Sequence, residues 1–170
     1  MVIKVGEIVK VADEEFIVLD KFGHSVLCLT KDFVYKNTRF DKDTNNYAKS
    51  EIRHKLNTEY LDKIAKSVGR MNIWDEEIDL TSDDGLDDYG KVTDPVGLLT
   101  ADMYRKYNRI IERYPVNGWW WLATPWSTPH RNVSFSVRCV GFDGTLYGSD
   151  CNFGIGVRPF LIFSTSIFES

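Results

Sequence analysis

The sequence is poor in the features that mark secreted, membrane-spanning and nucleic-acid-binding proteins. Its 170 residues contain three cysteines, an odd number that does not make a disulfide framework. No run approaches the roughly 18 apolar residues of a membrane helix, so we expect no membrane span. The net charge of −4 leaves no basic stripe for phosphates, which argues against nucleic acid as a partner.

The first residues, MVIKVGEIVKV, alternate like a strand and lack the continuous apolar core of a secretion signal. We therefore expect a cytoplasmic or virion-associated protein. The sequence leaves its oligomeric state open.

Motifs for catalysis and for metal binding are also missing. The chain has no phosphate loop, no dinucleotide fingerprint and no serine elbow. His24, His54 and His130 do not have the spacing of a zinc site. These absences predict a protein that is not an enzyme and that holds no metal and no cofactor.

Two features leave some chemistry open. Cys139 and Cys151 lie in one glycine-rich region, where they could approach and pair, and Arg138 is the only nearby cation that could activate a thiol. Residues 75–94 are rich in aspartate and glutamate but lack the ligand spacing of a calcium-binding hand. We expect that acidic segment to be a solvated loop, with cation binding as the alternative.

The chain reads as one domain, 1–170, of the α+β class. Residues 1–117 form a scaffold in which 6–32 predict an antiparallel meander of three short strands. Ser50 and Thr100 are placed to cap the two main helices. Residues 118–170 are aromatic, poor in charge and end in a strand destined for the core.

The final third uses a restricted set of residue types. Lys, Glu, Met and Trp occur 28 times in residues 1–126, whereas none occurs in 127–168, where that frequency predicts about nine. Gln is absent throughout. Burial explains the loss of Lys and Glu from a core strand, but not from 127–156, where His130, Arg131 and Asp150 indicate loops.

The words WWWLATPWS, VGFDGTLYG and GVRPFLIF occur in that order in the C-terminal part of the chain. They resemble the C-terminal half of C-type-lectin-fold domains related to formylglycine-generating enzyme, in particular an uncharacterised bacterial and phage family. The upstream pieces GEIVKV, SEIRHKLNTEYL and TDPVGLLTADMYRKY are similar to that family in the same order, so the resemblance covers nearly the whole chain. It implies a C-type-lectin-like fold with antiparallel sheets, two main helices and long irregular loops.

The resemblance also implies a function. Domains of this kind are recurrent variable proteins of diversity-generating retroelements, in which adenines of a template repeat are randomised on copying. Randomised asparagine codons that end in a pyrimidine cannot yield Lys, Glu, Gln, Met or Trp, the set missing from 127–168. The expected function is therefore binding of a variable ligand through residues 127–155, and we expect that ligand to be a protein.

Three alternatives stay open: an ordinary member of the fold with a charge-poor sheet, a structural phage or surface component, and a relative of the formylglycine-generating oxidase. The oxidase uses a closely spaced cysteine pair that binds copper, which the spacing of Cys139 and Cys151 does not match. The calcium-dependent sugar-binding motifs of lectins are absent.

The irregular positions between the family words give the candidate ligand-binding face: His130, Arg131, Asn132, Phe135, Arg138, Phe142, Tyr147, Ser149, Asn152, Phe153 and Ile155. The words themselves give a structural frame: Trp120, Trp121, Asp143, Gly144, Gly156, Arg158 and Pro159. Strand alternation puts Trp119 and Trp121 on one face and Trp120 on the other. We expect Arg158 to donate to loop carbonyls rather than to a ligand.

Overall fold

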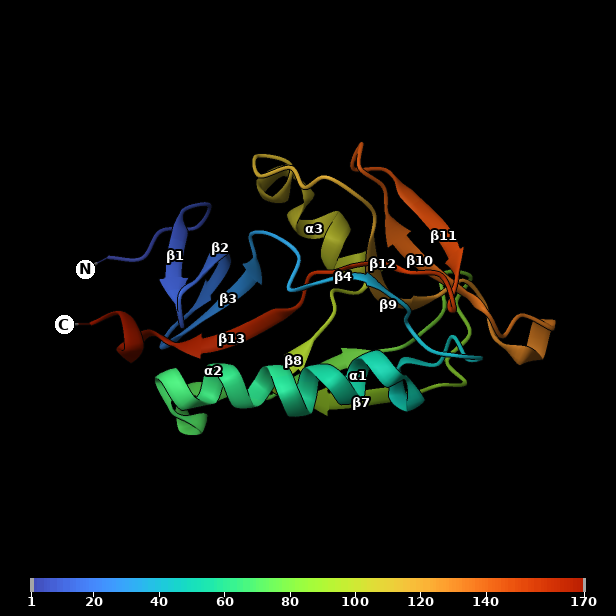
Figure 1. Cartoon of the computed structure of the whole chain (residues 1–170), viewed down its shortest axis with the longest axis horizontal. Helices are drawn as coiled ribbons and strands as arrows, with labels where there is room; N and C mark the ends of the chain where they lie inside the picture. The colour runs from blue at the N-terminus through green and yellow to red at the C-terminus, as the bar shows by residue number, and fades with distance from the viewer. Residues whose placement is uncertain (1, 170) are drawn as a thin grey trace.

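The computed structural model describes residues 2–169, which form two main sheets and a separate hairpin (Figure 1). The first sheet has the order β1-β2-β3-β13-β5, with β8 also paired to β13. Its strands are β1 (Ile8–Val11), β2 (Glu14–Phe22), β3 (Ser25–Thr30), β5 (Ile73–Trp74), β8 (Val96–Gly97) and β13 (Phe160–Ser164). The predicted meander of 6–32 is confirmed, because β1, β2 and β3 pair antiparallel in sequence order.

The second sheet has the order β11-β10-β9-β12-β4 and contains most of the C-terminal third. Its strands are β4 (Tyr35–Thr38), β9 (Trp120–Pro125), β10 (Ser136–Val140), β11 (Leu146–Asp150) and β12 (Ile155–Val157). The pairings are antiparallel apart from the short parallel contact between β12 and β9. The chain is thus of the α+β class with mainly antiparallel sheets, as predicted.

Two helical segments flank these sheets (Figure 1). The first comprises α1 (Glu51–Lys55), a π-helical stretch (Leu56–Tyr60) and α2 (Leu61–Val68), and the second is α3 (Ala101–Ile111). Ser50 and Thr100 cap them as predicted, accepting from the backbone N–H of Arg53 and of Met103. Short 3₁₀ turns occupy Tyr47–Lys49, Arg70–Asn72, Pro129–Arg131 and Thr165–Phe168.

The acidic segment 75–94 departs from the expected loop. It contains β6 (Glu76–Asp79) and β7 (Lys91–Asp94), which pair antiparallel over four residues each and leave only 80–90 as loop. Ile78 is buried and faces Val92 across the pair. One inward apolar residue in a run of carboxylates was enough to fix a strand, and the acidic composition concealed it.

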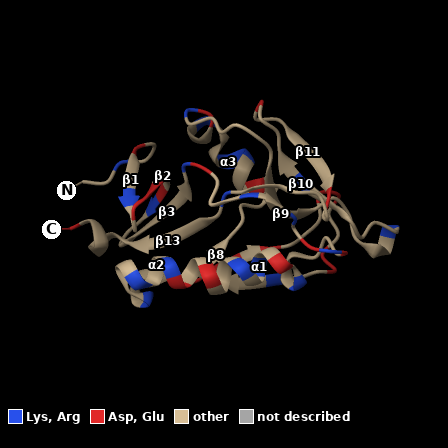
Figure 2. Ribbon diagram, in the orientation of Figure 1, with Lys and Arg blue, Asp and Glu red and all other residues tan. Residues whose placement is uncertain are grey.

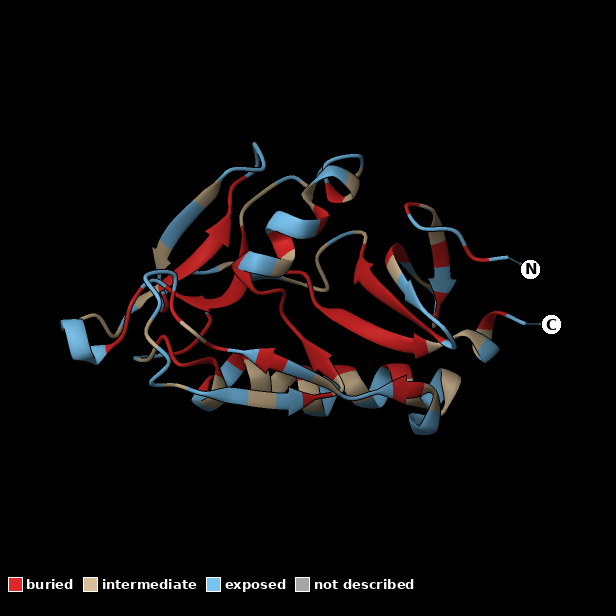
Figure 3. Ribbon diagram, turned by 180° about the vertical axis from the view of Figure 1, so that it is seen from behind, coloured by how far each residue is buried: buried red, intermediate tan, exposed pale blue. Residues whose placement is uncertain are grey.

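The core lies along β13, β9 and β10, whose residues are buried over most of their length (Figure 3). The predicted alternation of the tryptophans holds. Trp120 packs edge-on against Tyr104 of α3, whereas Trp121 packs against Phe40 on the opposite face of the sheet. The C-terminal third is therefore anchored from both sides.

Candidate recognition surface

The structure exposes most of the eleven candidate binding residues. Ser149 and Ile155 are half-buried and Arg138 is buried. The other eight are exposed, and they are called the recognition surface below: His130, Arg131, Asn132, Phe135, Phe142, Tyr147, Asn152 and Phe153. Charged residues are sparse on β10 and β11 compared with the α1–α2 helix (Figure 2).

Large apolar side chains are concentrated on this part of the molecule. Ten such residues are exposed among residues 2–169, and five of them lie between positions 126 and 153. Phe142 and Phe153 are the most exposed of the five, at 69% and 62%. Aromatic residues contribute much of the binding energy in protein interfaces, so this exposed set is a candidate interaction surface.

The β10–β11 hairpin sets where these aromatics point. Its five residue pairs run from Ser136–Asp150 to Val140–Leu146 without a register shift. Phe142 therefore lies at the turn, while Phe135 and Phe153 lie near the other end, where the Cys151 N–H donates to the Phe135 carbonyl at 2.8 Å. The recognition surface thus runs along the hairpin rather than forming one compact spot.

Tyr147 occupies the middle of the hairpin and joins it to the rest of the sheet. Its ring stacks on Trp119 with centroids 4.5 Å apart and an interplanar angle of 25°. Trp119 also lines a shallow groove of about 400 Å³ together with Phe33, Asn37, Gly154 and Ile155. Half-buried Ile155 therefore adjoins the recognition surface, as part of a groove that Trp119 also lines.

The turn at the tip of the hairpin is held by its own backbone and by α3. Asp143 accepts from the Thr145 N–H and hydroxyl and from the Tyr147 hydroxyl, and these contacts lower the pKa of Asp143. Gly144 has a φ of +84°, a backbone conformation that is unfavourable for residues with a side chain. The Tyr104 hydroxyl donates to its carbonyl at 2.6 Å. Phe142 is consequently presented on a fixed backbone.

Arg138 is not where the sequence placed it. The expectation of an exposed ligand contact is wrong, because Arg138 is only 8% exposed. It lies opposite Gly148, and its guanidinium is 4.7 Å from the ring centroid of Trp126 and 3.7 Å from Asp83. Because Gly148 has no side chain, the Trp126 indole has room to cover Arg138. Arg138 therefore belongs to the structural frame.

The acidic loop 80–90 holds the segment that carries His130, Arg131 and Asn132. Asp84 accepts from Ser82, Ser127 and Arg131, and these contacts lower its pKa to about 2. Thr128 donates to Asp88 at 2.7 Å. These aspartates therefore anchor a neighbouring loop, which the sequence did not reveal.

Buried Asn45 completes this anchor. Its amide donates to the carbonyls of Ser127 and Ser136, each at 3.0 Å, and it accepts from the Tyr89 hydroxyl. One side chain from an early loop thus connects both ends of the 127–136 segment. The exposed residues between these ends extend from a fixed backbone.

Arg158 acts as a donor to carbonyls, as the sequence predicted. Its Nε donates to Thr30 at 2.8 Å, and its Nη2 donates to Lys31 and Tyr114. Burial lowers its pKa to about 10, so it remains charged at neutral pH. The guanidinium also lies 5.1 Å from the Trp120 ring centroid. This network ties the end of β12 to two loops and to the core.

The cysteines are buried and unpaired. Cys139 and Cys151 do not form a disulfide with each other, and burial raises the pKa of each to about 11. Burial raises the pKa of Cys28 as well. A thiol with such a pKa is protonated at neutral pH and is a poor nucleophile and metal ligand. Within residues 2–169 no three His, Cys, Asp or Glu side chains gather closely enough to hold a metal ion.

The chain matches no protein-family model, no curated protein and no solved structure. Among the described residues, no helix combines the length and the apolarity needed to cross a membrane.

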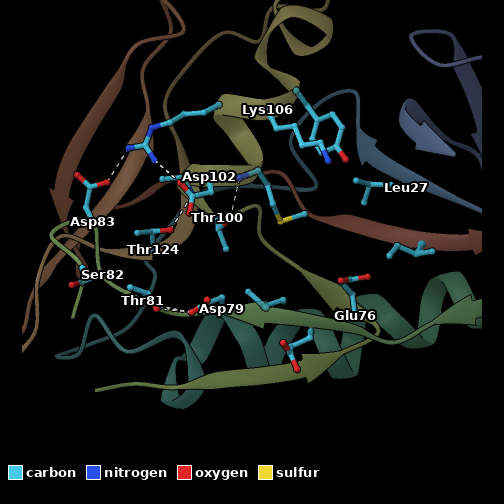
Figure 4. Close-up of a pocket in the computed structure, with 18 of the residues that line it drawn as sticks. Leu27, Glu76, Asp79, Thr81, Ser82, Asp83, Thr100, Asp102, Lys106 and Thr124 are labelled. Carbon is cyan, nitrogen blue, oxygen red and sulfur yellow. Dashed lines mark hydrogen bonds and ion pairs between the residues drawn. The ribbon is translucent and has the colours of Figure 1, made fainter. Parts of the chain in front are cut away.

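Sequence reasoning missed one further site, a cleft beside α3 (Figure 4). None of the eleven candidate residues lines it. The apolar residues and the carboxylates that do line it come from four different strands, the 80–90 loop and α3, so no local motif marks them.

Proposed function

We propose that this protein is a ligand-binding module whose recognition surface lies on and around the β10–β11 hairpin. The observation that carries the proposal is the concentration of exposed aromatic side chains (Phe135, Phe142, Tyr147 and Phe153) in a segment that buried Trp120, Trp121 and Arg158 anchor. Aromatic residues contribute most of the energy in protein interfaces, and a protein is the ligand class we assign.

The frame supports this role because it separates folding from binding. Trp120, Trp121 and Arg158 are almost fully buried and fix the sheet, while Asp84 and Asn45 hold the 127–136 segment. Exposed residues between such anchors can change without a large loss of stability. A rigid surface also binds with a smaller entropic cost than a flexible one.

We further propose that the domain has a C-type-lectin-like fold and is the variable protein of a diversity-generating retroelement, or a close relative of one. Exposed positions normally accept Lys and Glu, yet neither occurs between 127 and 168. Eight exposed positions in this segment rule out burial as a full explanation of that absence. The restricted alphabet fits mutation of a template that cannot encode those residues.

Binding is favoured over oxidase chemistry. An oxidase of the formylglycine-generating type needs a closely spaced reactive cysteine pair, whereas Cys139 and Cys151 are far apart in sequence, buried and of raised pKa. We expect no stoichiometric copper binding and no thiol-dependent oxygen consumption by the purified protein. Robust turnover would overturn the binding proposal in favour of the oxidase.

A pair of displayed libraries tests the function. The first randomises the eight residues of the recognition surface, and the control randomises eight exposed residues of the α1–α2 helix: Glu51, His54, Thr58, Glu59, Asp62, Lys63, Lys66 and Ser67. Both are selected against hen egg-white lysozyme as a probe protein. We expect binders from the first library at a frequency about tenfold or more above the control. Equal frequencies of binders from the two libraries would overturn the proposal.

A further inference from the structure

A cleft of about 520 Å³ lies away from the recognition surface, between β6 and α3 (Figure 4). Its size is within the range of small-molecule sites. Phe22 and Leu27 line it from β2 and β3, Ile162 from β13, and the residues of β6 from the other side. Figure 4 shows Glu76 on β6 and Lys106 on α3 as opposite walls of the opening.

The floor of the cleft is apolar. Leu27, Ile78 and Ile162 are buried core residues, and half-buried Met103 lies beside them. Phe22 stands at the margin with about half of its surface exposed. This lining favours an apolar ligand body, because binding would release water from the accessible apolar surface of Phe22 and Met103.

The carboxylate of Glu76 is an unpaired negative charge in the cleft. Within residues 2–169 it forms no ion pair, although desolvation and neighbouring Glu77 raise its pKa. Burial, the hydrogen bond that the Tyr107 hydroxyl donates to Asp20 at 2.6 Å and the negative charge of Glu76 together raise the pKa of Tyr107.

Most other charged groups of the cleft are engaged in ion pairs or hydrogen bonds. Glu77 pairs with Lys91, and Asp79 accepts from Thr81. Arg105 is held by both Asp83 and Asp102. The remaining cation, Lys106, has its Nζ 5.3 Å from the Tyr107 ring centroid and forms no ion pair with Glu76. Five carboxylates and two cations line the cleft, so its net charge is negative.

We propose that this cleft binds a small organic cation with an apolar body, a primary ammonium carried on an aliphatic or aromatic chain. The ammonium pairs with Glu76, and the body packs on Leu27, Met103 and Ile162. An apolar floor beside an unpaired carboxylate is complementary to this ligand class and not to an anion or a neutral sugar. The site is independent of the recognition surface.

The probe for the test is 2-phenylethylammonium, with 2-phenylethanol as its neutral counterpart. Titration followed by ¹H–¹⁵N NMR should give saturable shifts at the amides of 76–79 and 101–107. The neutral counterpart should bind about tenfold more weakly or worse, because a charge-assisted hydrogen bond is lost. Equal affinity for the two probes, or no saturable shift with the ammonium, would overturn the proposal.

Two variants test whether the ammonium pairs with Glu76. Glu76→Gln should weaken 2-phenylethylammonium about tenfold while leaving 2-phenylethanol unchanged. Glu77→Gln is the matched control, since Glu77 pairs with Lys91, and it should bind the ammonium within about twofold of the wild type. Unchanged ammonium affinity in Glu76→Gln would also overturn the proposal. The comparison of the two probes on the wild type needs no variant to fold.

Discussion

Arg131 Nη1 donates to Asp84 Oδ2 at 2.6 Å, so the loop that begins the recognition surface is joined to the loop between β6 and β7. The ion pair is partly exposed and by itself stabilises little. The pair matters because two further side chains, Ser82 and Ser127, donate to the same Asp84 carboxylate. Asp84 therefore holds three groups from two loops.

Asp84 should make stability depend on pH. Its pKa falls from an ordinary value of 3.8 to about 2 in the folded protein, so the folded state binds fewer protons than the unfolded state in that interval. The stabilisation is complete above about pH 4 and is lost as the pH falls toward 2. Melting temperatures measured from pH 7 to pH 2 should fall less steeply below pH 4 in Asp84→Asn than in the wild type.

Asp87→Asn is the control for this measurement. Its side chain makes no hydrogen bond to another described residue, although it lies in the same loop. It should keep the wild-type slope. If Asp84→Asn keeps that slope too, Asp84 does not anchor the loop.

The exposed aromatics should contribute to binding and little to folding. Phe142→Ala combined with Phe153→Ala removes two side chains that are mostly in solvent. Surface substitutions usually change stability by about 0.5 kcal/mol or less, so the melting temperature should stay within a few degrees of the wild type. A cooperative loss of structure in the double variant would show that these rings pack in the core.

Arg138 should behave in the opposite way. Arg138→Ala removes the guanidinium that lies against Trp126 and Asp83 in a buried site, and it should cost roughly 2–4 kcal/mol in urea unfolding. Arg131→Ala provides the comparison, because its exposed pair should cost about 1 kcal/mol or less. Equal costs for the two arginines would contradict the burial of Arg138.

Trp121 tests the frame. Its side chain is fully buried against Phe40, and its indole N–H donates to the Thr38 carbonyl at 2.9 Å. Trp121→Ala should cost about 3–5 kcal/mol, and Trp121→Phe less, because the ring volume is partly kept. Chemical unfolding of both variants measures this, and a cost near that of a surface substitution would show that β9 is not part of the core.

Local signals predicted much of the fold. Ser50 and Thr100 were recognisable as caps because a capping hydroxyl and the helix it starts are adjacent in sequence. The Trp119–Trp121 alternation was also predictable, since strand period alone fixes which face each ring takes. Arg158 was assigned correctly because an arginine beside a buried strand needs acceptors.

The features that the sequence did not predict depend on contacts between residues far apart in the chain. Trp126 covers Arg138, and it has room to do so because Gly148 has no side chain. Asp83, from the β6–β7 hairpin, lies on Arg138 as well. No window of the sequence contains all three. The cleft at Glu76 was missed for the same reason, as its floor comes from β3 and β13. A site assembled from several strands has no motif of its own.

The central claim is that residues 127–155 carry a diversified recognition surface, and the nucleotide sequence of the gene with its flanking DNA tests it most directly. Codons for His, Asn, Phe and Tyr always end in a pyrimidine, so the informative positions are Arg131, Ser149 and Ile155. We predict pyrimidine third bases there, and a near-identical copy of the segment, with adenines at the variable positions, beside a reverse transcriptase gene. Purine third bases at these codons, together with flanking DNA that holds neither the repeat nor the enzyme, would contradict the claim.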